Sequence, residues 1–284
     1  MADFVQFLGL AFVLGVPVVL AAMGGLTSER SGVMNIGLEG KMLFGACVTA
    51  MVATSTQNAW LGLVGGIGAA ILASLLHGVL TQVYRMDHVI SGMSINILAW
   101  GGTSYLYSPH FTDRAFGSTI PVVPREVFYL LAVAIPAVIW VYLKRTRGGI
   151  RLMAVGNDPE KSRQMGIDPI RVRFMALVAT GVFCGLAGAM IVSNTGRFSE
   201  GMTSGRGFIA LAALIIGGWR PVPTMIACFA FMLFQALQIQ FQGQAIFGVM
   251  LPNELWLSMP YLVTLLALAG LISKNSVPAG LGKA

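Results

Sequence analysis

Residues 144–173 read KRTRGGIRLMAVGNDPEKSRQMGIDPIRVR, and they form the one long polar stretch in an otherwise apolar chain. The stretch holds 8 of the 18 Lys and Arg residues, opposed only by Asp158, Glu160 and Asp168. Short basic loops of membrane proteins stay on the cytoplasmic side. We therefore expect this stretch to orient the membrane spans around it and to offer the largest surface for a soluble partner.

The composition indicates a polytopic membrane protein. Of the 284 residues, 56% are hydrophobic and 10% are charged, whereas soluble domains carry about 25% charged residues. The net charge of +7 could suggest nucleic acid, but a basic loop between apolar spans explains it more simply. We expect no nucleic-acid partner, and a single transmembrane domain over 1–284 with the cytoplasmic loop 145–172 inside it.

Outward from this loop, the sequence contains eight full apolar segments and one short segment. A membrane-spanning helix needs roughly 20 residues. The segments cover approximately 4–26, 36–54, 59–84, 89–107, 127–143, 174–195, 207–218, 222–241 and 255–273. The sequence thus predicts an all-α membrane protein with about eight or nine transmembrane segments, in which 207–218 is short or re-entrant.

The distribution of Lys and Arg also predicts the topology. Placing 144–173 in the cytoplasm puts the loops 108–126 and 196–206 outside, where acidic residues accompany the basic ones. The N-terminus then lies outside and the C-terminus inside, provided that 207–218 crosses the membrane. The tail from Ser273 onward is expected to be a frayed cytoplasmic end.

No pattern of catalytic or metal-binding residues is present. Cys47, Cys184 and Cys228 are far apart in apolar runs, which gives no metal-site spacing. The nearest approach to a nucleotide-binding loop, 156–162, lacks the second glycine and carries two acids where phosphate would lie. We therefore expect no catalytic, cofactor-binding or metal-binding residues and no enzymatic activity.

Small residues at a spacing of four predict close helix packing. Gly62 and Gly66 would lie on one helical face, as would Gly181, Gly185 and Gly188. Such faces let membrane helices approach closely. We interpret them as packing residues.

A second informative stretch, 27–41, reads TSERSGVMNIGLEGK. It places Asn35 and Glu39 four residues apart, so we expect both on one face at the start of an apolar helix. A carboxylate at membrane depth is costly and usually faces a cavity or a partner. The nearby glycines would permit a broken or re-entrant backbone, which is tolerated where it lines a cavity or is buried in protein.

Two interpretations of this stretch remain open at this point. In the first, Asn35 and Glu39 line the translocation path. In the second, the stretch is a short cytoplasmic turn whose charged residues pair locally at the interface. Those residues are Glu29, Arg30, Glu39 and Lys41.

Within the polar loop, the residues predict a short capped helix at 159–165. Asp158 suits the N-cap, Pro159 suits the first helical position and Gly166 suits the C-terminal stop. A helix this short is not stable alone. It must rest on lipid headgroups or in a groove on a partner, and composition does not choose between these.

Residues 155–167, VGNDPEKSRQMGI, resemble the coupling segment of ABC importer permeases that handle simple sugars, nucleosides and branched-chain amino acids. The Gly- and Ala-rich runs 181–189 and 213–218 follow as they do in that family. Residues 29–40 resemble the nucleoside branch most closely. One departure is that Lys161 and Ser162 replace the usual Ala pair, which questions how apolar the docking contact is.

The resemblance implies a permease subunit of an importer in the bacterial cytoplasmic (inner) membrane, forming the path for a nucleoside or related simple sugar. It implies a second permease subunit, identical or paralogous, and a periplasmic or lipid-anchored substrate-binding protein. A cytoplasmic ABC ATPase would bind ATP, so this chain would need no cofactor. The residues implied to couple to that ATPase are Gly156, Asn157, Asp158, Pro159, Glu160, Lys161, Ser162, Arg163, Gln164, Met165, Gly166 and Ile167.

Two alternatives remain. One is a branched-chain amino acid permease of the same family. The other is a secondary transporter driven by protons or sodium, which would need intramembrane acids as ion sites. Only Glu39 and Glu254 lie near spans, and both are near span ends.

Overall fold

The computed structural model describes residues 2–107, 120–242, 245–246, 249–250 and 277–283, and most of these residues are helical. The helices are α1 (Ala2–Arg30), α2 (Leu38–Thr56), α3 (Ala59–Gly78), α4 (His88–Leu106), α6 (Arg125–Arg145), α7 (Arg147–Asn157), α8 (Pro159–Gln164), α9 (Pro169–Thr195), α10 (Arg206–Ile216) and α11 (Pro221–Phe241). A π-helical turn, η1 (Val79–Val83), continues α3, and the two-residue strands β1 (Ala245–Ile246) and β2 (Val249–Met250) pair antiparallel.

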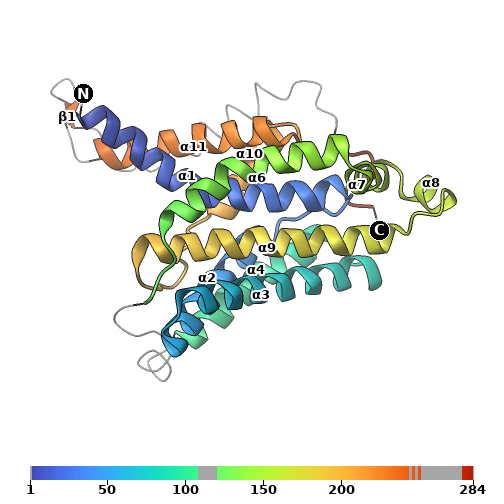
Figure 1. The fold of residues 1–284 in the computed structure, drawn as a ribbon, viewed down its shortest axis with the longest axis horizontal. Coiled ribbons are helices and arrows are strands. Elements are labelled where there is room, and N and C mark those ends of the chain that lie inside the picture. Colours follow the sequence, from blue (N-terminus) through green and yellow to red (C-terminus); the bar gives the residue numbers. More distant parts are fainter. Residues whose placement is uncertain (1, 108–119, 243–244, 247–248, 251–276, 284) are drawn as a thin grey trace.

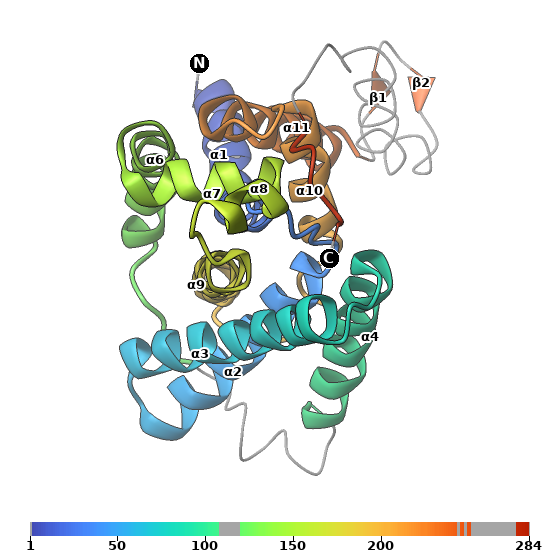
Figure 2. The ribbon, with the colours of Figure 1, turned by 90° about the vertical axis from the view of Figure 1, so that its right-hand side faces the viewer.

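The long helices lie side by side along one axis (Figure 1). We call the end that carries α7, α8 and the C-terminus the loop end (Figure 1). Viewed from the loop end, α9 lies between a group formed by α1, α6, α10 and α11 and a group formed by α2, α3 and α4 (Figure 2). Most of α9 is buried, so it is the central helix of the described bundle.

The predicted glycine faces let this central helix pack closely. A Cβ atom on Gly181 or Gly185 would overlap the backbone of α3 at Ile71 or Ile67, and one on Gly188 would overlap the backbone of α2. Close backbone approach strengthens dispersion contacts, which drive helix association in lipid. The interpretation of these glycines as packing residues is confirmed.

Five helices in the described part are long and apolar enough to cross a membrane: 4–30, 59–83, 125–145, 169–195 and 221–240. The 19-residue helices α2 and α4 match two more of the expected segments. The expected segment 255–273 lies outside the described residues. The chain is an all-α multi-pass membrane protein.

The short segment 207–218 forms α10, which has 11 residues. At 1.5 Å per residue it extends about 16 Å, roughly half of the 30 Å hydrocarbon thickness. The chain before it leaves α9 beside Arg125, whose Nε donates to the Ser193 carbonyl at 3.2 Å. The chain after it reaches Trp219, whose carbonyl accepts from Arg30 at the loop end. The loop 196–205 and the short helix α10, which we call the half-helix, together therefore connect the two ends of the bundle.

The basic stretch contains one helix that was expected, α8, and one that was not, α7. Asp158 Oδ1 accepts from the Lys161 amide at 3.0 Å as the N-cap of α8, and Gly166 has a φ of +79° after it. The predicted cap and stop are confirmed, with α8 ending at Gln164. The helix α7 was not predicted, although its buried residues, Gly149, Leu152, Val155 and Gly156, follow a helical spacing.

The expectation of a frayed C-terminus is wrong for residues 277–283. The Gly280 amide donates to the Gly156 carbonyl at 2.9 Å, and the Gly282 amide donates to the Gly32 carbonyl at 3.0 Å. Arg173 Nη2 donates to the Lys283 carbonyl at 2.9 Å. Backbone bonding to α7 and to the turn after α1 holds this tail at the loop end, a long-range contact that composition does not reveal.

Candidate functional site

The chain is broken between α1 and α2, as the glycines of 27–41 predict. Gly32 has a φ of +97°, and α2 begins only at Leu38. Asn35 therefore precedes the helix, and the expectation that Asn35 and Glu39 share one helical face is wrong. The turn before Leu38 reorients the backbone between them, so these two residues serve different neighbours.

Asn35 lies in a buried polar network. Its side-chain amide donates to Ser28 Oγ at 3.1 Å, and its Oδ1 accepts from Lys41 Nζ at 2.5 Å. The Asn35 backbone amide donates to Glu29 Oε1 at 3.3 Å. Asn35 and Lys41 have no exposed surface. The network therefore ties the end of α1 to the start of α2 from inside the protein.

Trp219 extends this network to the turn between α10 and α11. Its Nε1 donates to Glu29 Oε2 at 2.6 Å, and its carbonyl accepts from Arg30 Nε at 2.7 Å. Trp219 has a φ of +54°, which a bulky residue rarely adopts. Strain of this kind persists where surrounding contacts impose it, and here those contacts are two consecutive residues of α1.

The alternative interpretation, in which the charged residues of 29–41 pair with each other, is wrong. No ion pair joins these four described side chains. Glu29 and Arg30 bind Trp219, and Lys41 binds Asn35, as above. Glu39 binds the start of α10 instead. Sequence reasoning missed Trp219, although an indole donor inside the Gly-Gly-Trp-Arg-Pro break was a usable signal.

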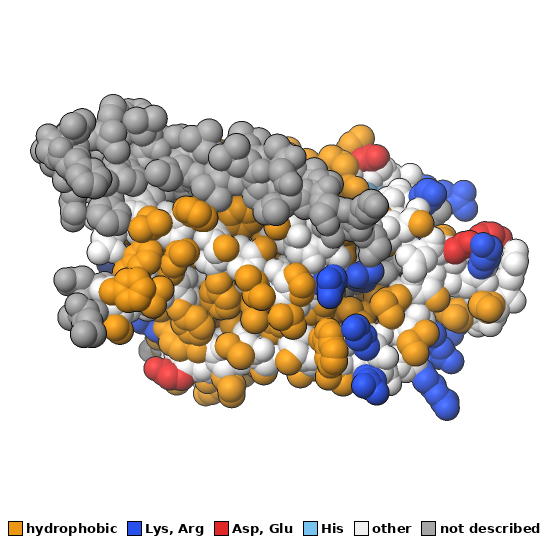
Figure 3. All heavy atoms as spheres, turned by 90° about the horizontal axis from the view of Figure 1, so that it is seen from above, with side chains coloured by type: hydrophobic (Ala, Val, Ile, Leu, Met, Phe, Trp, Pro, Cys, Tyr) orange, Lys and Arg blue, Asp and Glu red, His pale blue; other side chains and the backbone are white. Residues whose placement is uncertain are grey.

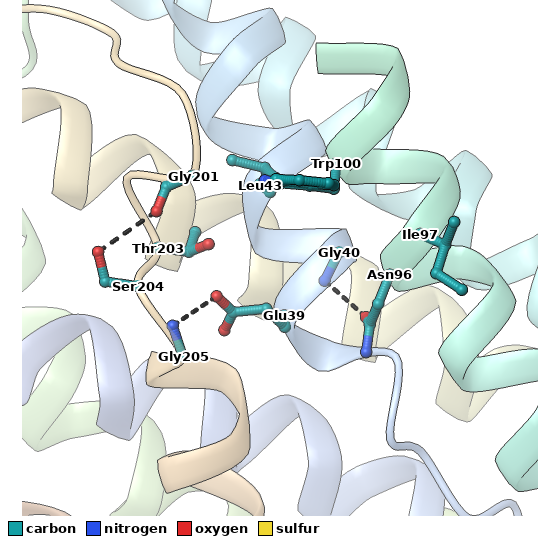
Figure 4. Close-up of a pocket in the computed structure, with 10 residues that line it drawn as sticks. All are labelled: Glu39, Gly40, Leu43, Asn96, Ile97, Trp100, Gly201, Thr203, Ser204 and Gly205. Atoms are coloured by element: carbon teal, nitrogen blue, oxygen red, sulfur yellow. Dashed lines mark hydrogen bonds between the residues drawn. The ribbon is translucent and has the colours of Figure 1, made fainter. Parts of the chain in front are cut away.

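Glu39 caps α10. Its Oε1 accepts from the Gly205 amide at 2.7 Å and its Oε2 accepts from the Gly207 amide at 2.6 Å. Figure 4 shows the carboxylate pointing at the loop that leads into α10. The first amides of a helix lack partners within the helix and carry partial positive charge. A carboxylate from α2 satisfies them here, which fixes the N-terminal end of the half-helix.

A cavity of about 370 Å³ lies beside this cap. Figure 4 shows Trp100 and Leu43 together at one side, with Glu39, Thr203 and Ser204 opposite Asn96 and Ile97. Its lining consists of Glu39, Gly40, Leu43, Asn96, Ile97, Trp100, Gly201, Thr203, Ser204 and Gly205. We call it the Glu39 cavity. It combines an aromatic ring, hydroxyl groups and a carboxylate, and no Lys or Arg is among the described residues that line it.

Two side chains of α4 shape the Glu39 cavity. Asn96 Oδ1 accepts from the Gly40 amide at 2.8 Å, and its amide donates to the Ile36 carbonyl at 3.1 Å. Asn96 thus holds the start of α2 in place. Trp100 is 65% exposed, so other residues of the chain cover only part of it. Neither residue was singled out from sequence, because each looks like an ordinary member of an apolar helix.

The predicted coupling residues are brought together at the tip of the loop end. Gly156 and Asn157 end α7, Asp158 caps α8, and Met165 to Ile167 form the turn after α8. Figure 1 shows α8 at the end of the described bundle, beside the C-terminus. Met165 is 80% exposed, so its thioether is available to a partner.

The surface of α8 is mainly charged and exposed. Lys161 pairs with Asp158 at 3.2 Å and Arg163 pairs with Glu160 at 3.7 Å. The backbone amide of Lys161, followed by its side chain, lowers the pKa of Asp158 below its ordinary value. Ser162 is the buried member, with Oγ donating to the Asp158 carbonyl at 2.8 Å. The contact that α8 offers is therefore polar, with Met165 as its apolar part.

Behind α8, Gly156 lies directly on the end of α1. A Cβ at Gly156 would overlap the Arg30 carbonyl. Arg173 of α9 donates to the Ser31 carbonyl at 3.3 Å and to Gln82 Oε1 at 2.6 Å. These contacts connect the predicted coupling residues to the broken turn after α1, which in turn leads to the Asn35 network and α10.

Comparison with known proteins identifies the family. The family model described as branched-chain amino acid transport system / permease component matches residues 8–268. The chain is 34% identical to the guanosine ABC transporter permease protein NupQ of Bacillus subtilis, over 99% of this chain and 97% of the relative. It is 30% identical to the nucleoside ABC transporter permease protein NupC of Lactococcus lactis, over 92% and 90%.

A third relative is a putative glucose ABC transporter permease protein, TsgC13 of Haloferax volcanii. It is 35% identical, over 79% of this chain and 74% of the relative. The resemblance drawn from the coupling segment and the glycine-rich runs is thus confirmed at the level of the family. This chain belongs to the branched-chain amino acid transport system / permease component family and is a transport permease rather than an enzyme.

Proposed function

We propose that this chain is the membrane-spanning permease subunit of an ATP-binding cassette importer and forms the path for a nucleoside or a related simple sugar. The relatives named for guanosine and nucleosides, which align with nearly the whole chain, support this substrate class. The structural observation that carries it is the Glu39 cavity, in which an open Trp100 ring faces a carboxylate and hydroxyl groups.

The chemistry of this cavity suits a nucleoside. A flat base stacks on an aromatic face, and Trp100 provides an exposed one. Ribose hydroxyl groups are donors, and each carboxylate oxygen of Glu39 keeps acceptor capacity beyond its one amide bond. Ser204 and Thr203 supply further hydroxyl groups at the same wall. Trp100 would therefore contact the base of a nucleoside, while Glu39, Thr203 and Ser204 would contact its ribose.

The two alternatives fit the cavity less well. A branched-chain amino acid carries a carboxylate, which needs a cation or several amide donors, yet the described residues that line the Glu39 cavity include no Lys or Arg. A proton- or sodium-driven carrier would use Glu39 as an ion site. The relatives of this chain are named as ABC transporter permeases, which supports an importer over an ion-driven carrier. Glu254 lies outside the described residues.

The coupling residues 156–167 would receive a cytoplasmic ATPase, which binds the ATP. A push on α8 reaches Gly156, which lies on the Arg30 carbonyl, and then Trp219 through the Arg30 and Glu29 contacts. Trp219 ends the turn after α10, whose first amides bind Glu39. In this proposal Asn35 stabilises the junction of α1 and α2 behind the translocation path, while Glu39 lines the path itself.

The complex would also need a second permease subunit, identical or paralogous, and a periplasmic or lipid-anchored binding protein. That protein would deliver solute at the end opposite α8, where 108–126 and 196–206 are expected. The docking of residues 277–283 beside Gly156 supports a C-terminus on the same side as the loop 144–173. The orientation of this side toward the cytoplasm rests on its basic residues.

An uptake panel tests the function. The purified complex with its ATPase would be reconstituted into proteoliposomes, and labelled nucleosides, ribose and leucine would be compared with and without ATP on the ATPase side. We expect ATP-dependent uptake of a nucleoside and none of leucine. Uptake without an ATPase that follows a proton gradient would contradict the proposal, and so would a preference for leucine.

A further inference from the structure

A second cavity lies at the loop end, between α6 and α7 on one side and the turn from α10 to α11 on the other. Its volume is about 370 Å³. Its lining consists of Arg30, Trp140, Leu143, Lys144, Met153, Trp219, Arg220, Pro221, Val222 and Pro223. Three of these residues are cations and none is acidic. We call it the basic cavity; it shares no lining residue with the Glu39 cavity.

The three cations of the basic cavity have no carboxylate partner in the described part of the chain. Arg30 uses Nε on the Trp219 carbonyl at 2.7 Å, and this bond anchors the guanidinium beside the cavity. Lys144 Nζ lies 5.1 Å from the centre of the Trp140 ring. Arg220 is exposed at the start of α11. Mutual repulsion of three like charges calls for a compensating anion.

The neighbouring acid, Glu29, does not supply that anion. Its two oxygens accept from Trp219 Nε1 and from the Asn35 amide, it is 1% exposed, and it does not line the basic cavity. The start of α11 adds to the positive potential, because no side chain caps it and the first peptide units of a helix carry partial positive charge. An anionic group is therefore the chemistry that the cavity accepts.

The position of the basic cavity favours a lipid as the source of that anion. Exposed apolar side chains continue the same helix faces: Val133, seven residues before Trp140 on α6, is 53% exposed, and Ile226, four residues after Val222 on α11, is 60% exposed. Figure 3 shows Lys and Arg side chains beside a broad apolar surface, toward the end that carries α8. Exposed indoles such as that of Trp140 are enriched at the boundary between hydrocarbon and water. Phosphate groups of a bilayer lie at this level.

We propose that the basic cavity binds the phosphate of an anionic phospholipid among Arg30, Lys144 and Arg220, with the acyl chains along α6 and α11. Each basic residue near an anionic lipid surface contributes attraction to the headgroup. The bound phosphate brings α6 and the α10–α11 turn together through one shared counterion. Because Arg30 also holds Trp219, lipid binding stabilises the turn that ends α10. This inference does not depend on the identity of the transported solute.

Thermal unfolding and native mass spectrometry of the detergent-purified chain test the proposal. Phosphatidylglycerol, phosphatidylcholine and inorganic phosphate would be added separately. We expect phosphatidylglycerol to raise the melting temperature and to appear as a bound adduct, with no matching effect of the other two. Arg30→Gln, Lys144→Gln and Arg220→Gln should each weaken phosphatidylglycerol binding by roughly fivefold, since one cation near an anionic surface is worth about 1 kcal/mol.

Arg145→Gln is the matched control. Arg145 follows Lys144 on α6, is exposed, and is not part of the basic cavity. It should keep the phosphatidylglycerol adduct. If Arg145→Gln and the cavity variants lose phosphatidylglycerol binding equally, the binding reflects general surface charge, and the proposed lipid site is wrong. Equal stabilisation by inorganic phosphate would assign the cavity to a free anion instead of a lipid, and equal stabilisation by phosphatidylcholine would overturn anion recognition. Arg220→Gln, at an exposed position, keeps the test decisive if Arg30→Gln does not fold.

Discussion

Glu39 accepts a hydrogen bond from the amide of Gly205, 166 positions later in the chain, at 2.7 Å. The same carboxylate accepts from Gly207 at 2.6 Å. One side chain of α2 thus fixes the start of the half-helix α10 and lines the Glu39 cavity. In the proposed function, Glu39 both positions the wall of the cavity and contacts the solute, so substitutions of Glu39 should affect both.

Glu39→Ala should lower both thermal stability and uptake. It leaves two helix-start amides without acceptors, and each unpaired buried amide costs about 1–3 kcal/mol. Glu39→Gln keeps one acceptor oxygen and should be intermediate. Apparent melting temperature and initial uptake rate would be measured on the assembled complex. Glu126→Ala, an exposed acid in the first turn of α6, is the control. Normal uptake by Glu39→Ala would exclude Glu39 from the path.

Trp100→Leu should raise the solute concentration required for half-maximal nucleoside uptake, because stacking of one base on an aromatic ring is worth roughly 1–3 kcal/mol. Ribose uptake, where present, should change less, since ribose has no base to stack. The exposed indole of Trp60 on α3 offers a matched control, as it does not line the Glu39 cavity. If Trp60→Leu and Trp100→Leu behave alike, stacking at Trp100 is refuted.

Gly166→Val should uncouple ATP hydrolysis from transport. The φ of +79° at Gly166 is strained for a β-branched residue by about 1–3 kcal/mol, so the turn that presents Met165 and Ile167 would shift. Asp158→Ala, which removes the cap of α8, should act in the same direction. ATPase activity and uptake would be measured in the same proteoliposomes. Gly68→Val, at a helical position with open space, is the control. Fully coupled transport in Gly166→Val would show that α8 is not the coupling element.

Trp219→Phe should destabilise the chain while leaving its membrane insertion intact. Phe keeps an aromatic ring but removes the donor to Glu29 Oε2, and an unpaired buried acceptor costs about 1–3 kcal/mol. We expect a lower apparent melting temperature than for Trp60→Phe, whose indole is exposed. Equal melting temperatures for the two variants would mean that the Glu29 bond contributes nothing to the turn after α10.

Local rules predicted the elements whose partners lie nearby in the chain. Asp158, Pro159 and Gly166 fix α8 through bonds that span a few residues, so the sequence was enough. The break near Gly32 was predicted for the same reason, because a glycine-rich turn needs a positive φ at one position.

Contacts between distant residues were not predictable from this sequence. Nothing near Glu39 indicates that its acceptors serve Gly205, and nothing near Arg30 indicates that it holds Trp219. The helix α7 was not predicted, although its buried residues and the exposed Arg147 and Arg151 lie on opposite helical faces, which is a pattern the sequence carries. The family resemblance supplied the role of the coupling segment, but the cavity beside Trp100 required the fold.

The most direct measurement is ATP-driven uptake of labelled guanosine by proteoliposomes that contain the complete complex, compared between wild type, Trp100→Leu and Trp60→Leu, with leucine uptake measured in parallel. We expect ATP-dependent guanosine uptake by wild type and Trp60→Leu, a clear loss at low guanosine concentration in Trp100→Leu, and no leucine uptake by any of them. ATP-dependent leucine uptake without guanosine uptake by the wild-type complex would contradict this expectation.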